Sequence, residues 1–229
     1  MWKNGNPQKA TPKQVGGKDG GETSHANFII AEEPPDAQSP PDGNDSDAYV
    51  LPESQDYTQE STGLVFPTVL QSTSAMLVAN GVRTKFRVKV YGVGVYVDPR
   101  LWKGKDKDAW DVMLNDPTTP ITLYIVLSRE LSSQKMISGL MAALTPFLTN
   151  DKESAKKFEG FNPKDATFAV NSVLRFDVGD SVTKYTHPEG KQHVLASREF
   201  ARGLKGVYFD GKGVIGGLKD DTMEGLRKL

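Results

Sequence analysis

The fold is decided by the stretch from Ala75 to Asp98, which reads AMLVANGVRTKFRVKVYGVGVYVD. Its Asn80-Gly81 pair is the strongest two-residue hairpin signal, and it separates an apolar run at 75–79 from a longer β-rich run at 82–98. At the start of the longer run, apolar and basic residues alternate, which predicts a half-buried strand. The apolar positions are Phe86, Val88 and Val90, and the basic positions are Lys85, Arg87 and Lys89.

The apolar face of this strand changes within the run. Up to Val90 the apolar residues have even numbers, whereas around Gly92 and Gly94 they have odd numbers, at Tyr91, Val93, Val95 and Val97. Because a slip of one residue exchanges the two faces of a strand, we expect a bulge or bend at these two glycines.

The rest of the chain alternates between strand and helix signals. Residues 120–128 predict a strand, and Ser132 is expected to cap a helix that runs to about Phe147. Three further strands are predicted at 172–179, 180–187 and 191–196, with a turn at 187–190 between the last two. Helices are predicted after a Ser197 cap and from Leu218 to Leu229. This order indicates an α+β fold, with helices layered on one face of an antiparallel sheet.

Composition divides the chain into two parts. Residues 1–60 carry four Lys and Arg against eleven Asp and Glu, and they hold seven of the fourteen prolines. Such a segment has too little apolar surface to offset its ordering entropy, so residues 1–61 are expected to form a disordered acidic tail. Residues 62–229 carry the opposite charge and are long enough for one well-buried domain.

Several functional classes lack support in the sequence. Cysteine is absent, so no disulfide or thiol site is expected, which fits an intracellular protein. The three histidines, His25, His187 and His193, lack ligand spacing, so neither a metal nor another cofactor is predicted. No nucleotide loop is convincing, and the basic residues at 83–89 lack the stacking aromatics of a nucleic-acid site. No apolar run reaches the roughly 20 residues of a membrane span.

Three motifs, in order, resemble the chalcone isomerase family over about Thr62 to Arg227. They are Gly81–Lys85 with Lys89–Tyr96, then Leu127–Ser132, then Ser197–Ala201 with Val207–Asp210 and Leu218-Lys219. The resemblance implies an open-faced β-sandwich, a large antiparallel sheet with a layer of helices, and a ligand cleft between them. It also implies one of two functions: an intramolecular lyase that closes a chalcone to a flavanone, or a non-catalytic protein that binds fatty acids.

The family's functional positions can be compared residue by residue. Its arginine matches Arg83 and its strand threonine matches Tyr91, which would be the catalytic residues of an isomerase. Its polar helix positions and a later threonine fall on Met136, Gly139, Ala143 and Val207. Apolar residues there oppose chalcone cyclisation. The binding function fits better, with Arg83 and Tyr91 on a carboxylate and Met136, Ala143 and Val207 along an apolar tail.

Two questions remain open from the sequence. On one straight strand, Arg83 and Tyr91 would lie roughly 26 Å apart, so the pair needs a turn between them or neighbouring strands. Otherwise Arg83 is a surface residue and Tyr91 a core aromatic.

A third function, a module that binds a partner enzyme, has no motif in its favour. We expect a monomer, in a plastid by resemblance or else in the cytoplasm, although the acidic N-terminus lacks transit-peptide character.

Overall fold

The computed structural model describes residues 50–105, 109–211 and 213–229. Its centre is a seven-stranded antiparallel sheet in the order β11-β10-β9-β6-β5-β4-β3. These strands are β3 (Val69–Leu70), β4 (Ala75–Lys85), β5 (Val88–Val97), β6 (Ile121–Leu127), β9 (Val173–Gly179), β10 (Val182–Thr186) and β11 (Gln192–Ala196). The strands expected after residue 120 are confirmed.

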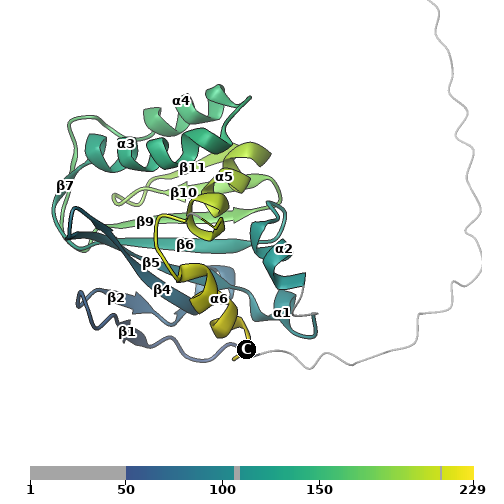
Figure 1. Cartoon of the computed structure of the whole chain (residues 1–229). Helices are drawn as coiled ribbons and strands as arrows, with labels where there is room; N and C mark the ends of the chain where they lie inside the picture. Colours follow the sequence, from purple (N-terminus) through teal and green to yellow (C-terminus); the bar gives the residue numbers. More distant parts are fainter. Residues whose placement is uncertain (1–49, 106–108, 212) are drawn as a thin grey trace, which may run out of the picture. The chain divides into compact units, whose positions relative to one another are not determined.

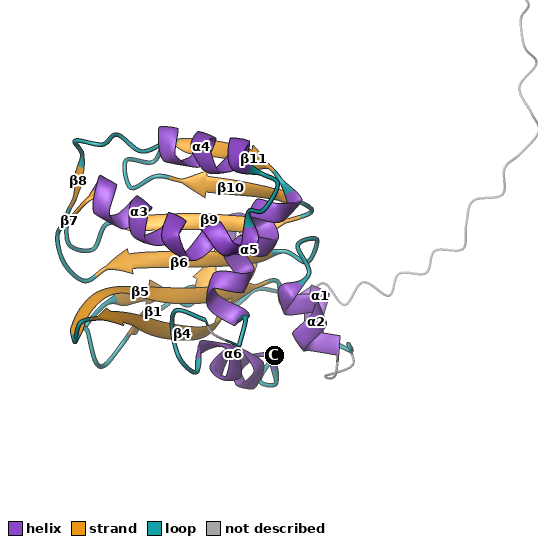
Figure 2. Ribbon diagram, turned by 45° about the horizontal axis from the view of Figure 1, so that its top comes forward, coloured by secondary structure: helices purple, strands orange, loops and turns teal. Residues whose placement is uncertain are grey.

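Helices cover one face of this sheet, as Figures 1 and 2 show. They are α3 (Ser133–Leu144), α4 (Lys152–Gly160), α5 (Arg198–Phe209) and α6 (Leu218–Leu226), while α1 (Pro99–Trp102) and α2 (Trp110–Asn115) lie between β5 and β6 in the chain. Short strands β7 (Leu131–Ser132) and β8 (Thr167–Phe168) pair beside the main sheet. The expected α+β fold, an antiparallel sheet under a helix layer, is therefore confirmed.

Side-chain caps start the principal helices where the sequence predicts them. The Ser132 hydroxyl accepts a hydrogen bond from the Lys135 amide at the start of α3. The Ser197 hydroxyl accepts one from the Phe200 amide at 3.0 Å, which starts α5. Each cap satisfies an amide that has no partner within the helix, and it contributes about 1 kcal/mol.

Helix α5 is the central element of the helix layer. It is buried on nearly all sides, as expected of a helix packed between a sheet and other helices. Gly203 and Gly206 allow Phe147 to pack against it, because a Cβ at these positions would lie 2.9 and 2.5 Å from Phe147 carbon atoms. The segment that ends at Phe147 is thereby held close to α5.

The hairpin expected at Asn80-Gly81 is in a different place. Asn80 and Gly81 lie inside β4, and the chain turns at Phe86 and Arg87, whose φ angles are 51° and 65°. Gly81 is needed for packing, since a Cβ there would lie 2.7 Å from Cγ2 of Ile215. The prediction of Phe86 and Val88 on a half-buried face was also wrong, because both side chains are exposed at the turn.

The expected bulge exists, but two residues earlier than predicted. Thr84 pairs with Lys89 and Arg83 pairs with Tyr91, so Val90 is an extra residue in β5. A second irregularity leaves Val78 as an extra residue in β4. The change of apolar face follows from the bulge at Val90.

Gly92 and Gly94 allow close packing on the face of the sheet opposite the helices. A Cβ at Gly92 would lie 2.9 Å from Leu64 and Phe66 atoms, and one at Gly94 would lie 3.0 Å from Phe66. These two apolar residues belong to the segment of β1 (Asp56–Thr58) and β2 (Val65–Pro67), which pair with each other. The glycines therefore let this small hairpin pack closely on the face opposite the helices.

The folded part begins before the expected boundary at Thr62. Strand β1 starts at Asp56, and the Ser54 hydroxyl donates a hydrogen bond to the carbonyl of Val69 at 2.9 Å. The sequence predicts an acidic tail over residues 1–61, and the first 49 of these lie outside the described residues.

Candidate functional site

Arg83 and Tyr91 face each other across the β4–β5 ladder. Residues directly opposite in an antiparallel pair carry Cβ atoms about 4.5–5.5 Å apart on the same face. Arg83 and Tyr91 are not separated by the length of a straight strand, because the chain turns at Phe86 and Arg87 and places the two residues on neighbouring strands. The geometric requirement set by the sequence, a turn between the two residues, is therefore met.

The Arg83 guanidinium lies under the loop between α5 and α6. The side chain is half-buried, and its Nη1 donates a hydrogen bond to the carbonyl of Val214. The Val214 amide in turn donates to the carbonyl of Val207 at 2.8 Å, which ties this loop to α5. Within the described ranges, Arg83 takes part in no ion pair. A positive charge that no carboxylate of the described residues pairs with is thus held at the sheet–helix boundary.

Two tyrosine hydroxyls lie within the field of this charge. Burial raises the pKa of Tyr91 above its usual value, while Tyr208 and Arg83 lower it in part. Burial also raises the pKa of Tyr208, and the nearby Tyr91 raises it further. The two hydroxyls interact closely enough to act on each other's pKa, but in the described chain the buried Tyr208 hydroxyl makes no hydrogen bond of regular geometry. Both phenols therefore stay protonated at neutral pH and can donate to an anion.

The apolar positions named by resemblance separate into two groups. Met136 and Val207 are each 3% exposed and belong to the same core cluster as Tyr91. Ala143 is partly buried and packs against that cluster. Gly139 is exposed on α3, and no atom outside its own helix lies within 4 Å of where its Cβ would be. Met136, Ala143 and Val207 thus contribute to the core that contains Tyr91, whereas Gly139 does not.

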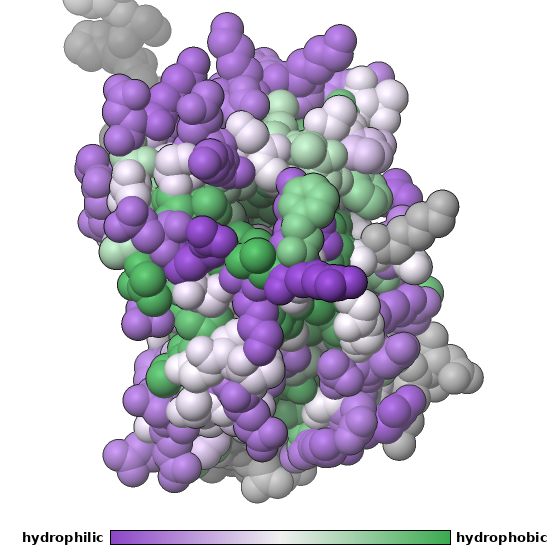
Figure 3. Space-filling view, turned by 60° about the vertical axis from the view of Figure 1, so that its left-hand side comes forward, coloured by the Kyte–Doolittle hydropathy of each residue, from purple (hydrophilic) through white to green (hydrophobic). Residues whose placement is uncertain are grey.

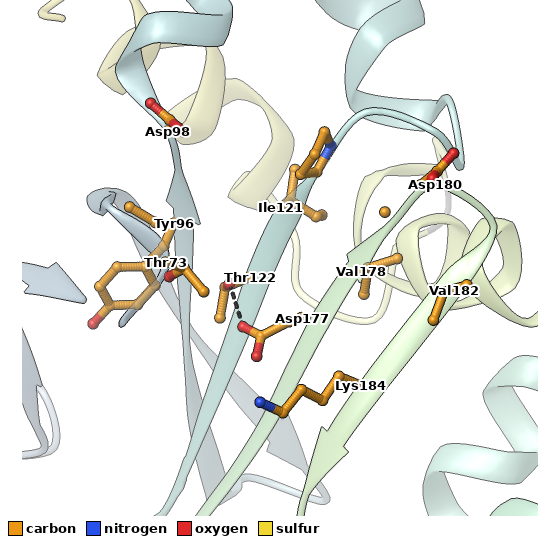
Figure 4. A pocket seen from close by; sticks show the side chains of 13 residues that line it. Thr73, Tyr96, Asp98, Ile121, Thr122, Asp177, Val178, Asp180, Val182 and Lys184 are labelled. Carbon is orange, nitrogen blue, oxygen red and sulfur yellow. Dashed lines mark hydrogen bonds between the residues drawn. The ribbon is translucent and has the colours of Figure 1, made fainter. Parts of the chain in front are cut away.

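One hollow with a mainly apolar lining lies on the opposite face of the sheet. It measures about 300 Å³ and is drawn in Figure 4, where Thr122 donates to Asp177 at 2.6 Å. Its charged lining consists of three acidic residues and one lysine, namely Asp98, Asp177, Asp180 and Lys184. Asp98 and Asp177 are paired with Arg100 and Arg175, so Lys184 is the one cation among the residues that line this hollow.

Three other hollows lie along α2 and α5 and beside α6. Arg83, Tyr91, Tyr208 and Met136 line none of the four. Of the pair, Tyr91 is buried in the core and Arg83 is half-buried at its edge.

Sequence reasoning missed Tyr208 and the Val214 carbonyl. Tyr208 lies in the third motif, one position after Val207, but a tyrosine in a helix gives no sign of whether its hydroxyl is paired. A backbone carbonyl carries no sequence signal at all. The described residues contain no group of three acidic or histidine side chains that could hold a metal. In the same ranges, every helix is too short or too polar to cross a membrane.

Comparisons with known proteins agree with this fold. No curated protein matches the sequence. Among solved structures, the fold is similar to that of a fatty-acid binding protein from Arabidopsis thaliana, with a TM-score of 0.64 and 16% identity over 75% of this chain and 97% of that chain. A family model described as chalcone isomerase-like matches residues 58–223. Since this match covers most of the sequence, the chain belongs to the chalcone isomerase-like family.

Proposed function

We propose that this protein binds a fatty acid or a chemically similar apolar carboxylate, with the head group on Arg83 and Tyr91. The observation that carries the proposal is the half-buried guanidinium of Arg83, which has no ion-pair partner in the described chain and lies directly opposite Tyr91. A buried charge is normally paired, because desolvation penalises it. An anionic ligand would supply the missing partner.

The chemistry of the three side chains suits a carboxylate. A guanidinium presents several N–H groups in a planar fork, and Nη1 alone is engaged with Val214 in the described chain. The protonated Tyr91 and Tyr208 hydroxyls can donate to the same anion. Hydrogen bonds to a charged group contribute about 1.5–3 kcal/mol each, so one lost donor weakens binding about ten- to hundredfold.

The apolar tail would lie between the sheet and the helices, near Met136 and Val207. Each buried methylene contributes about 0.8 kcal/mol by transfer free energy, so a long acyl chain can supply most of the affinity. Met136 and Val207 are buried in the core, so the tail has to displace side chains. Met136 is unbranched and readily changes rotamer, which makes it the side chain best suited to such displacement.

The test compares a long-chain fatty acid with its methyl ester in binding to lipid-stripped protein. The acid should bind more tightly than the ester, and Arg83→Ala should abolish that preference. Arg83→Lys should recover it only in part, since an ammonium lacks the fork. Arg202→Ala, at an exposed position of α5, is the matched control and should behave as the unmodified protein. Equal binding of acid and ester by the unmodified chain would refute the head-group assignment. Mass spectrometry of lipid extracted from the purified protein would identify the ligand.

The alternative, closure of a chalcone to a flavanone, is favoured less by the residues. It also uses a cation and donors, which Arg83 and Tyr91 offer, but it needs further polar groups on α3. Met136 and Val207 present apolar side chains instead, and Gly139 faces solvent. We expect no loss of chalcone absorbance above the spontaneous rate. Turnover that disappears in Arg83→Ala would reverse the order of the two functions.

Two further expectations belong to this proposal. A plastid location, implied by the family resemblance, or else a cytoplasmic one can be tested with a fluorescent fusion of the protein. A monomeric state can be tested by light scattering coupled to size exclusion.

A further inference from the structure

The tip of the β4–β5 hairpin exposes apolar side chains to an unusual degree. Phe86 is 89% exposed and Val88 is 42% exposed. Figure 3 shows the side of the molecule on which this hairpin ends, where apolar residues gather in a band among charged ones. Val170 lies in the loop before β9, at the same end of the sheet, and is also half-exposed.

The residues of the turn are poorly suited to forming it. Both central residues have positive φ, at 51° for Phe86 and 65° for Arg87. Turns of this kind prefer Asn and Gly, and a bulky residue with positive φ is strained. The chain contains an Asn-Gly pair, but it lies within β4. An exposed aromatic ring held in a strained conformation points to a role outside the fold.

Two basic residues flank the exposed ring in the chain. Lys85 Nζ lies 5.7 Å from the centroid of the Phe86 ring, and Arg87 follows it in the turn. In the part of the chain that the structure describes, neither of these two cations forms an ion pair. Lys89 donates to the carbonyl of Ser61, so it adds charge while it braces the hairpin.

We propose that this tip docks on an anionic lipid surface, with Phe86 inserted at the headgroup boundary and with Lys85 and Arg87 on the phosphates. Aromatic side chains favour this boundary, and basic residues beside it are attracted to anionic lipids. A protein partner is a weaker match, because a stable protein interface buries about 800 Å² on each side, and here a single ring projects.

The proposal goes beyond fatty-acid binding and does not require it. Phe86 lies three residues from Arg83, which is about 10 Å along the strand. A docked bilayer would therefore lie close to the proposed head-group site.

The test is co-flotation of the full chain, without added fatty acid, with lipid vesicles. The protein should bind vesicles of phosphatidylcholine mixed with phosphatidylserine, but not pure phosphatidylcholine, and binding should weaken as salt rises. Each cation contributes about fivefold, so Lys85→Ala with Arg87→Ala should weaken binding about 25-fold. Phe86→Ala should weaken it about tenfold. A Phe86→Trp variant should show a blue shift of its fluorescence on the mixed vesicles.

Two variants separate docking from folding. Phe86→Asn with Arg87→Gly supplies the preferred turn residues, so it should raise the melting temperature while binding falls roughly fiftyfold. Val194→Ala changes another exposed valine, on β11, and should leave binding unchanged. Failure of the unmodified chain to bind mixed vesicles, equal binding to both compositions, or no effect of Phe86→Ala would overturn the proposal. Capture of an acidic protein without any vesicle binding would overturn it as well.

Discussion

The unpaired hydroxyl of Tyr208 makes Tyr208→Phe the most informative single substitution. This hydroxyl is buried and makes no hydrogen bond of regular geometry in the described chain, although the Tyr91 hydroxyl lies near enough to raise its pKa through a hydrogen-bond interaction. If it is reserved for a ligand, its removal should stabilise the ligand-free protein and weaken ligand binding. General damage to the fold would lower both stability and binding, so a variant that is more stable but binds more weakly cannot be explained by such damage.

The magnitude follows from the cost of leaving a polar group buried and unpaired, which is about 1–3 kcal/mol. For a domain of this size, a change of 1 kcal/mol in the free energy of unfolding shifts the melting temperature by about 2–4 °C. We expect Tyr208→Phe to raise the melting temperature of lipid-stripped protein by at least about 2 °C. The same variant should bind a long-chain fatty acid about tenfold more weakly.

Tyr185→Phe is the matched control. The Tyr185 hydroxyl is also buried, but it donates to Oδ1 of Asn162 at 2.7 Å. Its removal leaves a buried acceptor unpaired, so the melting temperature should fall by about 2 °C or more. Calorimetry of the three proteins after lipid removal measures both shifts. If Tyr208→Phe destabilises the chain as Tyr185→Phe does, Tyr208 is paired with Tyr91 and the argument for a reserved donor fails.

Three other predictions concern the fold. Burial lowers the pKa of Lys205 to about 8, so between pH 8 and 10 the unfolded chain binds more protons than the folded one. The unfolding free energy should therefore rise with pH across this window, and pH titration of Lys205→Met should lack that rise. Gly225→Ala should lower the free energy of unfolding by about 3 kcal/mol, because the added Cβ would lie 1.8 Å from the Val78 carbonyl oxygen. Gly139→Ala should raise it by about 0.5–1 kcal/mol, because no atom outside its own helix lies within 4 Å of the added Cβ. Urea unfolding measures both changes. Limited proteolysis should leave a resistant fragment that starts before Asp56; a fragment starting at Thr62 would contradict the pairing of β1 with β2.

Local rules predicted the elements whose causes are local. Ser132 and Ser197 cap helices because a hydroxyl meets an amide three residues later, and both partners are visible in the sequence. The strands after residue 120 likewise follow from their own composition. The hairpin prediction failed at Asn80-Gly81 because the reason for Gly81 is distant in sequence: Ile215 packs where its Cβ would be. No window of neighbouring residues contains that contact.

The candidate site was predictable only in part. Family resemblance named Arg83 and Tyr91, but a spacing of eight residues does not bring two side chains together on one strand. The turn that does so consists of Phe86 and Arg87, which carry no turn signature. Tyr208 was missed because burial of a tyrosine is visible from a helix pattern, whereas the lack of a hydrogen-bond partner is visible only in three dimensions.

The bulge at Val90 explains why the pair shares a face at all. With a two-residue turn at 86–87 and no extra residue, Arg83 would pair with Val90, and Tyr91 would point to the opposite face. The inserted Val90 places Tyr91 opposite Arg83 on the helix side. The second extra residue, Val78, restores the register farther along β4, where α6 packs its Gly225 against the Val78 carbonyl. The loop before α6 then brings the Val214 carbonyl to Arg83. The position of the pair therefore depends on strand irregularities and on the packing of α6, and a change at either should alter the site without touching Arg83 or Tyr91.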